Sequence, residues 1–282
     1  MAKGRIRIGV VAPASRLDPS VPADVRALAE RLYPDRPPEL LFHPQCFASS
    51  GHFAGDDAIR TAAFVEYAND DSLDAIWFAR GGYGSCRIAE AVLAGLAAPA
   101  GRKTYLGYSD GGSLLAALYG RGVGAPVHGP IPQDIRREGG EAAVARALAW
   151  LVDRDPGSLE PAAAGGAPCV AFNITVLSQL LGTPLQPDLA GHVLMLEEVA
   201  EYMYRIDRSL FHITANPAMR QVAGIMLGRC DPIPANEPDF GLDEEQVARL
   251  WCERSGIAWL GRADIGHDVG NKVVPFGGLA RG

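Results

Sequence analysis

Cysteine is scarce in this sequence, with five residues in 282, and no two of them form a Cys-x-x-Cys pair. An odd number of scattered cysteines provides neither a disulfide framework nor the ligand spacing of a zinc site. We therefore expect reduced thiols in the hydrophobic core and no bound metal. The five positions are Cys46, Cys86, Cys169, Cys230 and Cys252.

Long runs of positive charge and long apolar runs are also absent. The formal net charge is −7, and the sequence has no cluster of lysine and arginine that could neutralise phosphates. Both observations argue against nucleic acid or an anionic membrane as the main partner. The sequence contains no stretch of about 18 apolar residues, which is the length that a membrane-spanning helix needs. The N-terminus enters a strand-like run that Pro13 ends, without the apolar region of a signal peptide. We expect a cytoplasmic protein whose partners are small molecules.

The usual nucleotide-binding motifs are missing as well. The segment Arg80-Gly81-Gly82-Tyr83-Gly84 follows the apolar run 75–79, but it has neither the Gly-x-Gly-x-x-Gly spacing of a dinucleotide site nor the Gly-Lys-Ser/Thr ending of a P-loop. Glycine-rich turns between a strand and a helix expose backbone N–H groups. The segment could therefore be a plain tight turn or a donor for an oxyanion hole, with phosphate binding the weaker interpretation. No cofactor is predicted.

Short β-like runs alternate with helical periods along the first half of the chain. Residues 5–11 and 75–79 are apolar runs ended by proline or glycine, as expected of strands buried in a parallel sheet. Helical stripes occur at Ala58, Ala62 and Val65, at Ile88, Val92 and Leu96, and at Val144, Leu148 and Leu151. This order predicts an α/β protein with an open, mostly parallel N-terminal sheet and flanking helices, of the flavodoxin or glutamine-amidotransferase type.

The pattern stops between residues 153 and 168, which are rich in proline, glycine, alanine and aspartate and favour neither helix nor strand. A second α/β unit follows, with strand-like runs at 193–196 and 222–227 between helical stripes. We predict two domains joined by a linker: residues 1–152, the linker 153–168, and a smaller C-terminal α/β domain of residues 169–282.

Gly107-Tyr108-Ser109-Asp110-Gly111 spells Gly-x-Ser-x-Gly directly after the apolar run 104–106 and before the apolar segment 112–119. This is the nucleophile-elbow pattern, in which a sharp turn between a strand and a helix presents a serine hydroxyl to a base. The pattern also arises by chance in glycine-rich chains, and this chain has 33 glycines.

A nucleophilic Ser109 needs a base, and the base needs an orienting group. His267 lies in a glycine-flanked loop, where it could equally be a surface histidine, and His128 at the end of a strand is the second candidate. His212 falls in a helical stripe and is interpreted as structural. Glu197 and Glu198 close the apolar run 193–196, and the C-terminal ends of strands are where α/β sheets gather catalytic groups.

Several of these motifs, in this order, closely resemble the LD-carboxypeptidase family of serine peptidases. The family includes the muramoyltetrapeptide carboxypeptidases of murein recycling and the microcin C immunity peptidases. The resemblance rests on Arg80 to Gly84, Gly107 to Asp110, Leu196-Glu197-Glu198 with Tyr204-Arg205-Ile206-Asp207-Arg208, and Gly266-His267-x-x-x-Asn271. Supporting matches are Val11 to Ser15, His52 to Asp57 with Arg60, and His128-Gly129-Pro130.

The resemblance implies a triad in which Ser109 is the nucleophile, His267 the general base and acid, and Glu197 the group that orients the imidazole. It further implies an oxyanion hole formed by the backbone amides of Asp110 and of Gly81 or Gly82. Arg80, Tyr83 and Arg205 are the expected substrate-binding side chains, although either arginine could be purely structural. The implied activity is release of the terminal D-alanine from a murein tetrapeptide by a homodimer, without metal or cofactor.

The sequence also departs from the family pattern. Ala171-Phe172-Asn173 stands where Gly-Gly-Asn is usual, which bears on substrate contacts, and the chain ends at Gly282, where we expect a further short strand or two. Only 88 residues separate Ser109 from Glu197 (197 − 109), which favours the murein branch over the microcin branch. An α/β-hydrolase-type esterase, with the same Ser…Glu…His order, and a non-catalytic peptide- or sugar-binding protein remain alternatives.

Overall fold

The computed structural model describes residues 5–278, and its first sheet has six strands in the order β10-β5-β4-β3-β1-β2. Strands β1 to β5 pair in parallel, and only β10 runs antiparallel, against β5. The order β2-β1-β3-β4-β5 is that of flavodoxin-like folds, as predicted. The bounds are β1 Arg7–Val11, β2 Glu39–Phe42, β3 Ala75–Phe78, β4 Thr104–Gly107, β5 Ala125–His128 and β10 Val274–Pro275.

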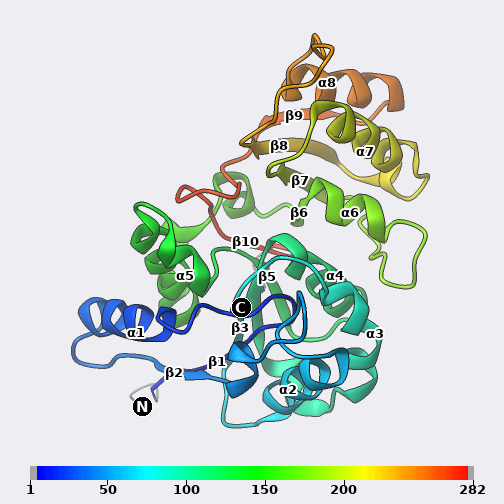
Figure 1. The fold of residues 1–282 in the computed structure, drawn as a ribbon. Helices are drawn as coiled ribbons and strands as arrows, with labels where there is room; N and C mark the ends of the chain where they lie inside the picture. The colour runs from blue at the N-terminus through cyan, green and yellow to red at the C-terminus, as the bar shows by residue number, and fades with distance from the viewer. Residues whose placement is uncertain (1–4, 279–282) are drawn as a thin grey trace.

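Helices cover both faces of this sheet because its central strands are apolar on both sides: every residue of β3 and β4 is buried. Helices α1 (Val21–Leu32) and α5 (Gly140–Asp153) lie on one face. Helices α2 (Asp57–Asn69), α3 (Ser85–Gly95) and α4 (Gly112–Gly120) lie on the other face (Figure 1). Each face therefore has its own hydrophobic core.

The second sheet has four parallel strands in chain order: β6 (Cys169–Asn173), β7 (Val193–Glu198), β8 (Gly224–Cys230) and β9 (Trp259–Arg262). Helices α6 (Ile174–Leu180), α7 (Met203–Ala215) and α8 (Glu244–Ser255) connect or flank these strands (Figure 1). The predicted α/β class, with a mostly parallel first sheet and a second α/β unit, is thus confirmed.

The chain returns from the second sheet to the first at its C-terminal end. After β9 it passes through residues 263–273 and adds β10 to the edge of β5, where Val274 is opposite His128 (Figure 1). Part of the segment predicted as C-terminal domain therefore belongs to the first sheet. Residues 153–168 contain two short 3-10 helices, Pro156–Ser158 and Pro161–Gly165. The further strands expected at the chain end would follow residue 278, outside the described residues.

The two sheets share apolar packing. The ring of Phe172 in β6 lies 5.1 Å from that of Phe276, just after β10, and it also faces the start of α4 at Gly112. Both residues belong to the core cluster that contains α4 and α6. These contacts pack β6 of the second sheet against α4 and the segment after β10 in the first unit.

Candidate active site

Ser109 lies at the sharp turn between β4 and α4, partly exposed, with a φ of +59°. Positive φ is uncommon for a residue with a side chain and marks a strained turn, as the nucleophile-elbow pattern requires. Gly107 is needed there because a Cβ at that position would lie 2.4 Å from the Phe78 ring. The local sequence thus forces the Ser109 side chain out at the carboxyl edge of the sheet.

His267 brings two distant segments to Ser109. Its Nε2 lies 2.9 Å from Ser109 Oγ, and its Nδ1 is hydrogen-bonded to Glu197 Oε2. Glu197 stands near the end of β7 and is fully buried, and the His267 side chain is 6% exposed. The serine thus comes from the first sheet, the carboxylate from the second, and the histidine from the segment that joins them.

The charge of Glu197 sets the proton affinity of the imidazole. Burial, the largest effect, acts to lower the pKa of His267. The charge of Glu197 and its hydrogen bond oppose it and, with smaller contributions from Glu198 and Asp134, raise the pKa above its ordinary value. An imidazole in this setting can accept a proton from the serine hydroxyl and hold it beside a carboxylate.

The turn containing Gly81 and Gly82 lies against the serine. A Cβ on Gly81 would be 3.0 Å from Ser109 Oγ and 4.0 Å from the backbone nitrogen of Asp110. Within residues 5–278, neither the Gly81 nor the Gly82 N–H donates a hydrogen bond to the protein. Donors grouped around a nucleophile in this way can stabilise an oxyanion.

Asp110 connects the turn that carries Ser109 to the segment that follows Gly81 and Gly82. Its buried carboxylate accepts hydrogen bonds from the backbone N–H groups of Gly84 at 3.3 Å and Ser85 at 2.8 Å, and its carbonyl accepts one from the Ser85 hydroxyl. Burial raises the pKa of Asp110 even though these donors act to lower it. The positions of Ser109 and of the Gly81–Gly82 turn are therefore coupled through a side chain that does not itself reach the serine hydroxyl.

The predicted substrate-binding side chains are not all near Ser109. The Arg80 guanidinium donates to the carbonyl of Arg16 at 3.0 Å. Arg205 is exposed on α7 and pairs with Glu201 at 2.8 Å, with no described contact to Ser109, Glu197 or His267. Tyr83 is 52% exposed beside the rings of His52 and Phe53.

The other acidic candidate and the unusual Ala171-Phe172-Asn173 segment have structural contacts. Glu198 binds Asn173 and Thr175 at the start of α6, and burial raises its pKa. Ala171 and Phe172 are buried in β6, and Asn173 caps α6 through Val176 N. His212, predicted within a structural stripe, is exposed on α7 because the buried face of that helix is formed by Ile206, Leu210 and Ile213.

The structure adds a role that sequence patterns did not reveal. His128 is buried, and its Nε2 lies 3.0 Å from Asn271 Oδ1, which also accepts the Gly266 N–H at 3.2 Å. Burial lowers the pKa of His128, so a neutral ring with its proton on Nε2 fits this contact. Both residues belong to recognisable motifs, but only the fold shows that they meet.

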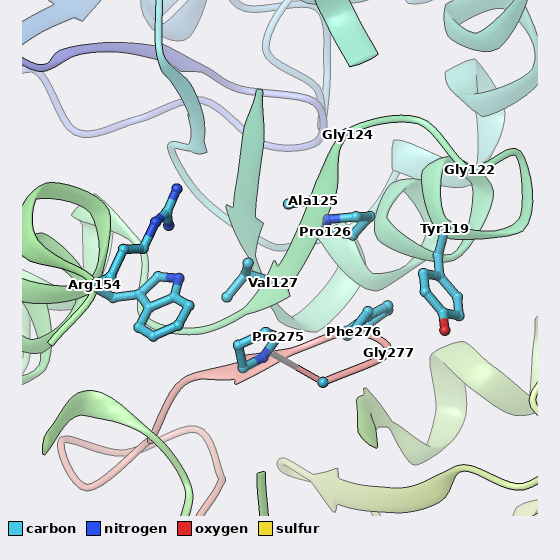
Figure 2. Close-up of a pocket in the computed structure, with 12 residues that line it drawn as sticks. Tyr119, Gly122, Gly124, Ala125, Pro126, Val127, Arg154, Pro275, Phe276 and Gly277 are labelled. Carbon is cyan, nitrogen blue, oxygen red and sulfur yellow. The ribbon is translucent and has the colours of Figure 1, made fainter. Parts of the chain in front are cut away.

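No helix within residues 5–278 is long and apolar enough to cross a membrane. The same residues hold no group of three or more His, Cys, Asp or Glu side chains that could bind a metal ion. A cavity of about 720 Å³ lies away from the triad, at the amino end of β5, between Tyr119, Arg154 and Phe276 (Figure 2). All five cysteines are free, and four are buried.

Each half of the chain matches a domain of a known protein family. Residues 8–129 match the LD-carboxypeptidase N-terminal domain, and residues 167–281 match the LD-carboxypeptidase C-terminal domain. The chain is 31% identical to a putative carboxypeptidase of Synechocystis over 86% of its own length and 80% of that protein. The chain belongs to the LD-carboxypeptidase family. The protein is therefore a carboxypeptidase, a peptide hydrolase, which decides against the α/β-hydrolase alternative.

Other relatives agree. A murein tetrapeptide carboxypeptidase of Pseudomonas aeruginosa is 29% identical over 74% of this chain and 72% of that protein. The structure of a muramoyltetrapeptide carboxypeptidase from Oxalobacter formigenes superposes with a TM-score of 0.78 at 20% identity, covering 95% of this chain and 93% of that one. The microcin C7 self-immunity protein MccF superposes with a TM-score of 0.75 at 16% identity, covering 98% of this chain and 92% of that one. At these identities the structures show a shared fold.

Proposed function

We propose that this LD-carboxypeptidase is a serine enzyme that removes the terminal D-alanine from murein tetrapeptides. The observation that carries the proposal is the 2.9 Å contact between His267 Nε2 and Ser109 Oγ, with Glu197 on the opposite side of the imidazole. The names of the Pseudomonas and Oxalobacter relatives support the substrate.

In the proposed first step, Ser109 Oγ attacks the carbonyl carbon of the bond that joins the L-configured centre of the diamino acid to D-alanine. His267 Nε2 accepts the hydroxyl proton, and Glu197 stabilises the resulting imidazolium. The N–H groups of Asp110 and of Gly81 or Gly82 bind the oxyanion. The C–N bond then breaks, and His267 returns its proton to the leaving amine of D-alanine.

The second step releases the acyl group. Water donates a proton to His267 Nε2 and attacks the ester carbonyl, which passes through the same oxyanion position. The Ser109 ester bond breaks, and Ser109 Oγ recovers its proton from His267. The products are a tripeptide with a free carboxylate and D-alanine.

The test is incubation with murein tetrapeptide, followed by mass spectrometry for loss of one alanine. Parallel reactions use the same peptide ending in L-alanine, an aminoacyl sulfamoyl nucleoside and a simple ester. We expect at least tenfold lower kcat/KM for the L-ended peptide, which corresponds to about 1.4 kcal/mol of transition-state discrimination. Preferential turnover of the nucleoside would move the protein to the microcin type, and no turnover of any substrate would leave a binding protein.

We further propose that the enzyme works as a cytoplasmic homodimer, as the family resemblance implies. Multi-angle light scattering should give twice the chain mass of 29.9 kDa. A mass of one chain across micromolar concentrations would contradict the dimer. Fractionation of cells that express the native protein tests the compartment.

A further inference from the structure

A carboxypeptidase must recognise the free carboxylate at the end of its substrate, and the two arginines expected to bind substrate are engaged elsewhere. Arg80 donates to the Arg16 carbonyl, and Arg205 is paired with Glu201. The carboxylate therefore needs other donors near Ser109.

Gly81 and Gly82 face two different neighbours. The Cβ direction of Gly81 points to Ser109, at 3.0 Å from its Oγ. That of Gly82 points to Ser15 Oγ at 2.2 Å and, further on, to His52 Nε2 at 3.8 Å. The Cα atoms of Gly81 and Gly82 are about 3.8 Å apart. The Ser15 and His52 side chains beside Gly82 are therefore displaced by about one residue length from the Ser109 hydroxyl beside Gly81.

This spacing matches the substrate. The carbon of a terminal carboxylate lies within about 4 Å of the scissile carbonyl carbon, since only the amide nitrogen and one Cα separate them. A peptide whose scissile carbonyl contacts Ser109 would therefore bring its carboxylate to the face of Gly82 that carries Ser15 and His52.

Ser15 and His52 have the chemistry for an anion. Ser15 follows β1, at the point between β1 and β3 where the strand order reverses and α/β sheets commonly bind ligands. Its hydroxyl is 3.4 Å from His52 Nε2, so a proton on that nitrogen can be donated to Ser15 Oγ while the Ser15 O–H donates outward. The N–H of Gly82, unused within residues 5–278, is a third donor.

His52 is held in place by its neighbours. Its ring makes an edge contact with Phe53 at 5.4 Å and a tilted contact with Tyr83 at 6.3 Å. Ser15 is 7% exposed, whereas His52 and Gly82 are open to solvent. The donors thus line an accessible surface instead of filling the core.

We propose that Ser15, His52 and the Gly82 N–H form the subsite for the terminal carboxylate of the leaving amino acid, which leaves the Gly81 N–H for the oxyanion hole. The subsite rests on the proposed carboxypeptidase reaction at Ser109. In this subsite a hydroxyl, an imidazole and a backbone amide recognise the free C-terminus, and the Tyr83 ring borders the subsite beside His52.

Steady-state kinetics on two peptides test the subsite: one tetrapeptide with a free C-terminus and the same peptide amidated. We expect wild type to prefer the free acid by at least tenfold in kcat/KM. Ser15→Ala and His52→Phe should raise KM for the free acid about tenfold and leave kcat/KM for the amide unchanged, so that the preference is lost. His52→Gln, which keeps an N–H donor, should retain part of it.

His212→Phe is the matched control for His52→Phe, since it makes the same change of side chain on the exposed face of α7, and it should keep the preference. An unchanged preference in both Ser15→Ala and His52→Phe, or an equal loss in His212→Phe, would overturn the subsite. Circular dichroism melting confirms that each variant is folded.

Direct binding separates failure of the subsite from failure of the proposed reaction. Isothermal titration of Ser109→Ala with an N-acylated dipeptide ending in D-alanine, against its amide, requires no turnover. Tighter binding of the acid that Ser15→Ala abolishes supports the subsite even if wild type hydrolyses neither peptide. Equal binding of acid and amide overturns it.

Discussion

His128 and Asn271, 143 residues apart in the chain, are joined by a buried hydrogen bond of 3.0 Å. His128 ends β5 of the first sheet, and Asn271 lies four residues beyond His267. Because Asn271 Oδ1 also accepts the Gly266 N–H, one carbonyl ties the backbone beside His267 to the first sheet. This pair therefore helps to set the orientation of the imidazole toward Ser109.

Removal of the donor at His128 should slow the reaction without weakening substrate binding. His128→Phe keeps a ring of similar size but has no N–H, and a small displacement of a catalytic group can cost up to about 100-fold in rate. We expect kcat to fall at least tenfold with KM within about twofold. His128→Gln, whose Nε2 can still donate to Asn271, should recover much of kcat. Wild-type kcat in the Phe variant would contradict the role of this hydrogen bond.

Ser109→Ala should abolish hydrolysis while the protein stays folded. Loss of a triad nucleophile typically costs about 10⁴-fold or more in kcat. Ser113→Ala, a buried change in α4 just after the Ser109 turn, is the control and should retain activity. More than about a tenth of wild-type turnover in Ser109→Ala would remove this residue from the mechanism.

The rate should increase with pH through the titration of His267, because only the neutral imidazole can accept the serine proton. Glu197 raises the pKa of His267 against the effect of burial, so Glu197→Gln should shift the acidic limb of kcat/KM to lower pH and reduce its plateau. His212→Ala, on the exposed face of α7, should leave the limb unchanged. An unshifted limb in Glu197→Gln would mean that another group controls it.

The elbow glycine should be important for stability. Gly107→Ala places a methyl group 2.4 Å from the ring of buried Phe78, and overpacking of this kind costs about 1–3 kcal/mol of unfolding free energy. Gly101→Ala is the matched control, because nothing lies within 4 Å of its added Cβ. Urea unfolding of both variants provides the measurement. Equal midpoints would show that Phe78 moves aside at little cost.

The sequence was sufficient for the elements that follow simple patterns. The strand before Ser109 and the apolar helix after it were predicted from residues 104–119 and are present as β4 and α4. A helix with an apolar stripe at Ala58, Ala62 and Val65 was also predicted and is present as α2, but the stripe was assigned to the wrong face. Ala58 and Ala62 are exposed, whereas Arg60 and Phe64 are buried.

Arg60 explains that error. Its side chain is fully buried, donates to the carbonyls of Pro13 and Gly84, and pairs with Asp57. A hydropathy pattern treats arginine as a surface residue, so it cannot recognise a guanidinium that links two turns in the interior.

Contacts between the two sheets could not be predicted from sequence patterns, because such patterns describe only local structure. Motifs suggested Ser109, Glu197 and His267 as candidates, but the distances among them depend on how two sheets pack. The same holds for His128 with Asn271, for β10 against β5, and for Ser15 beside Gly82. Their roles in catalysis stay predictions that the experiments above address.

The segment that carries His267 is bound to both sheets. Before His267, Asp264 is paired with Arg229 of β8 in the second sheet. After it, Asp268 is paired with the same Arg229, and the carbonyls of Val269 and Asn271 accept hydrogen bonds from Arg146 of α5, which packs on the first sheet.

His267 is thus fixed to the second sheet through Glu197 and Arg229, whereas Ser109 belongs to the first sheet, so a relative rotation of the two sheets would move the imidazole relative to the serine hydroxyl. A substitution in the apolar contact between the sheets, such as Phe172→Leu, would be transmitted to the proton-transfer distance at Ser109 although it touches no reacting atom.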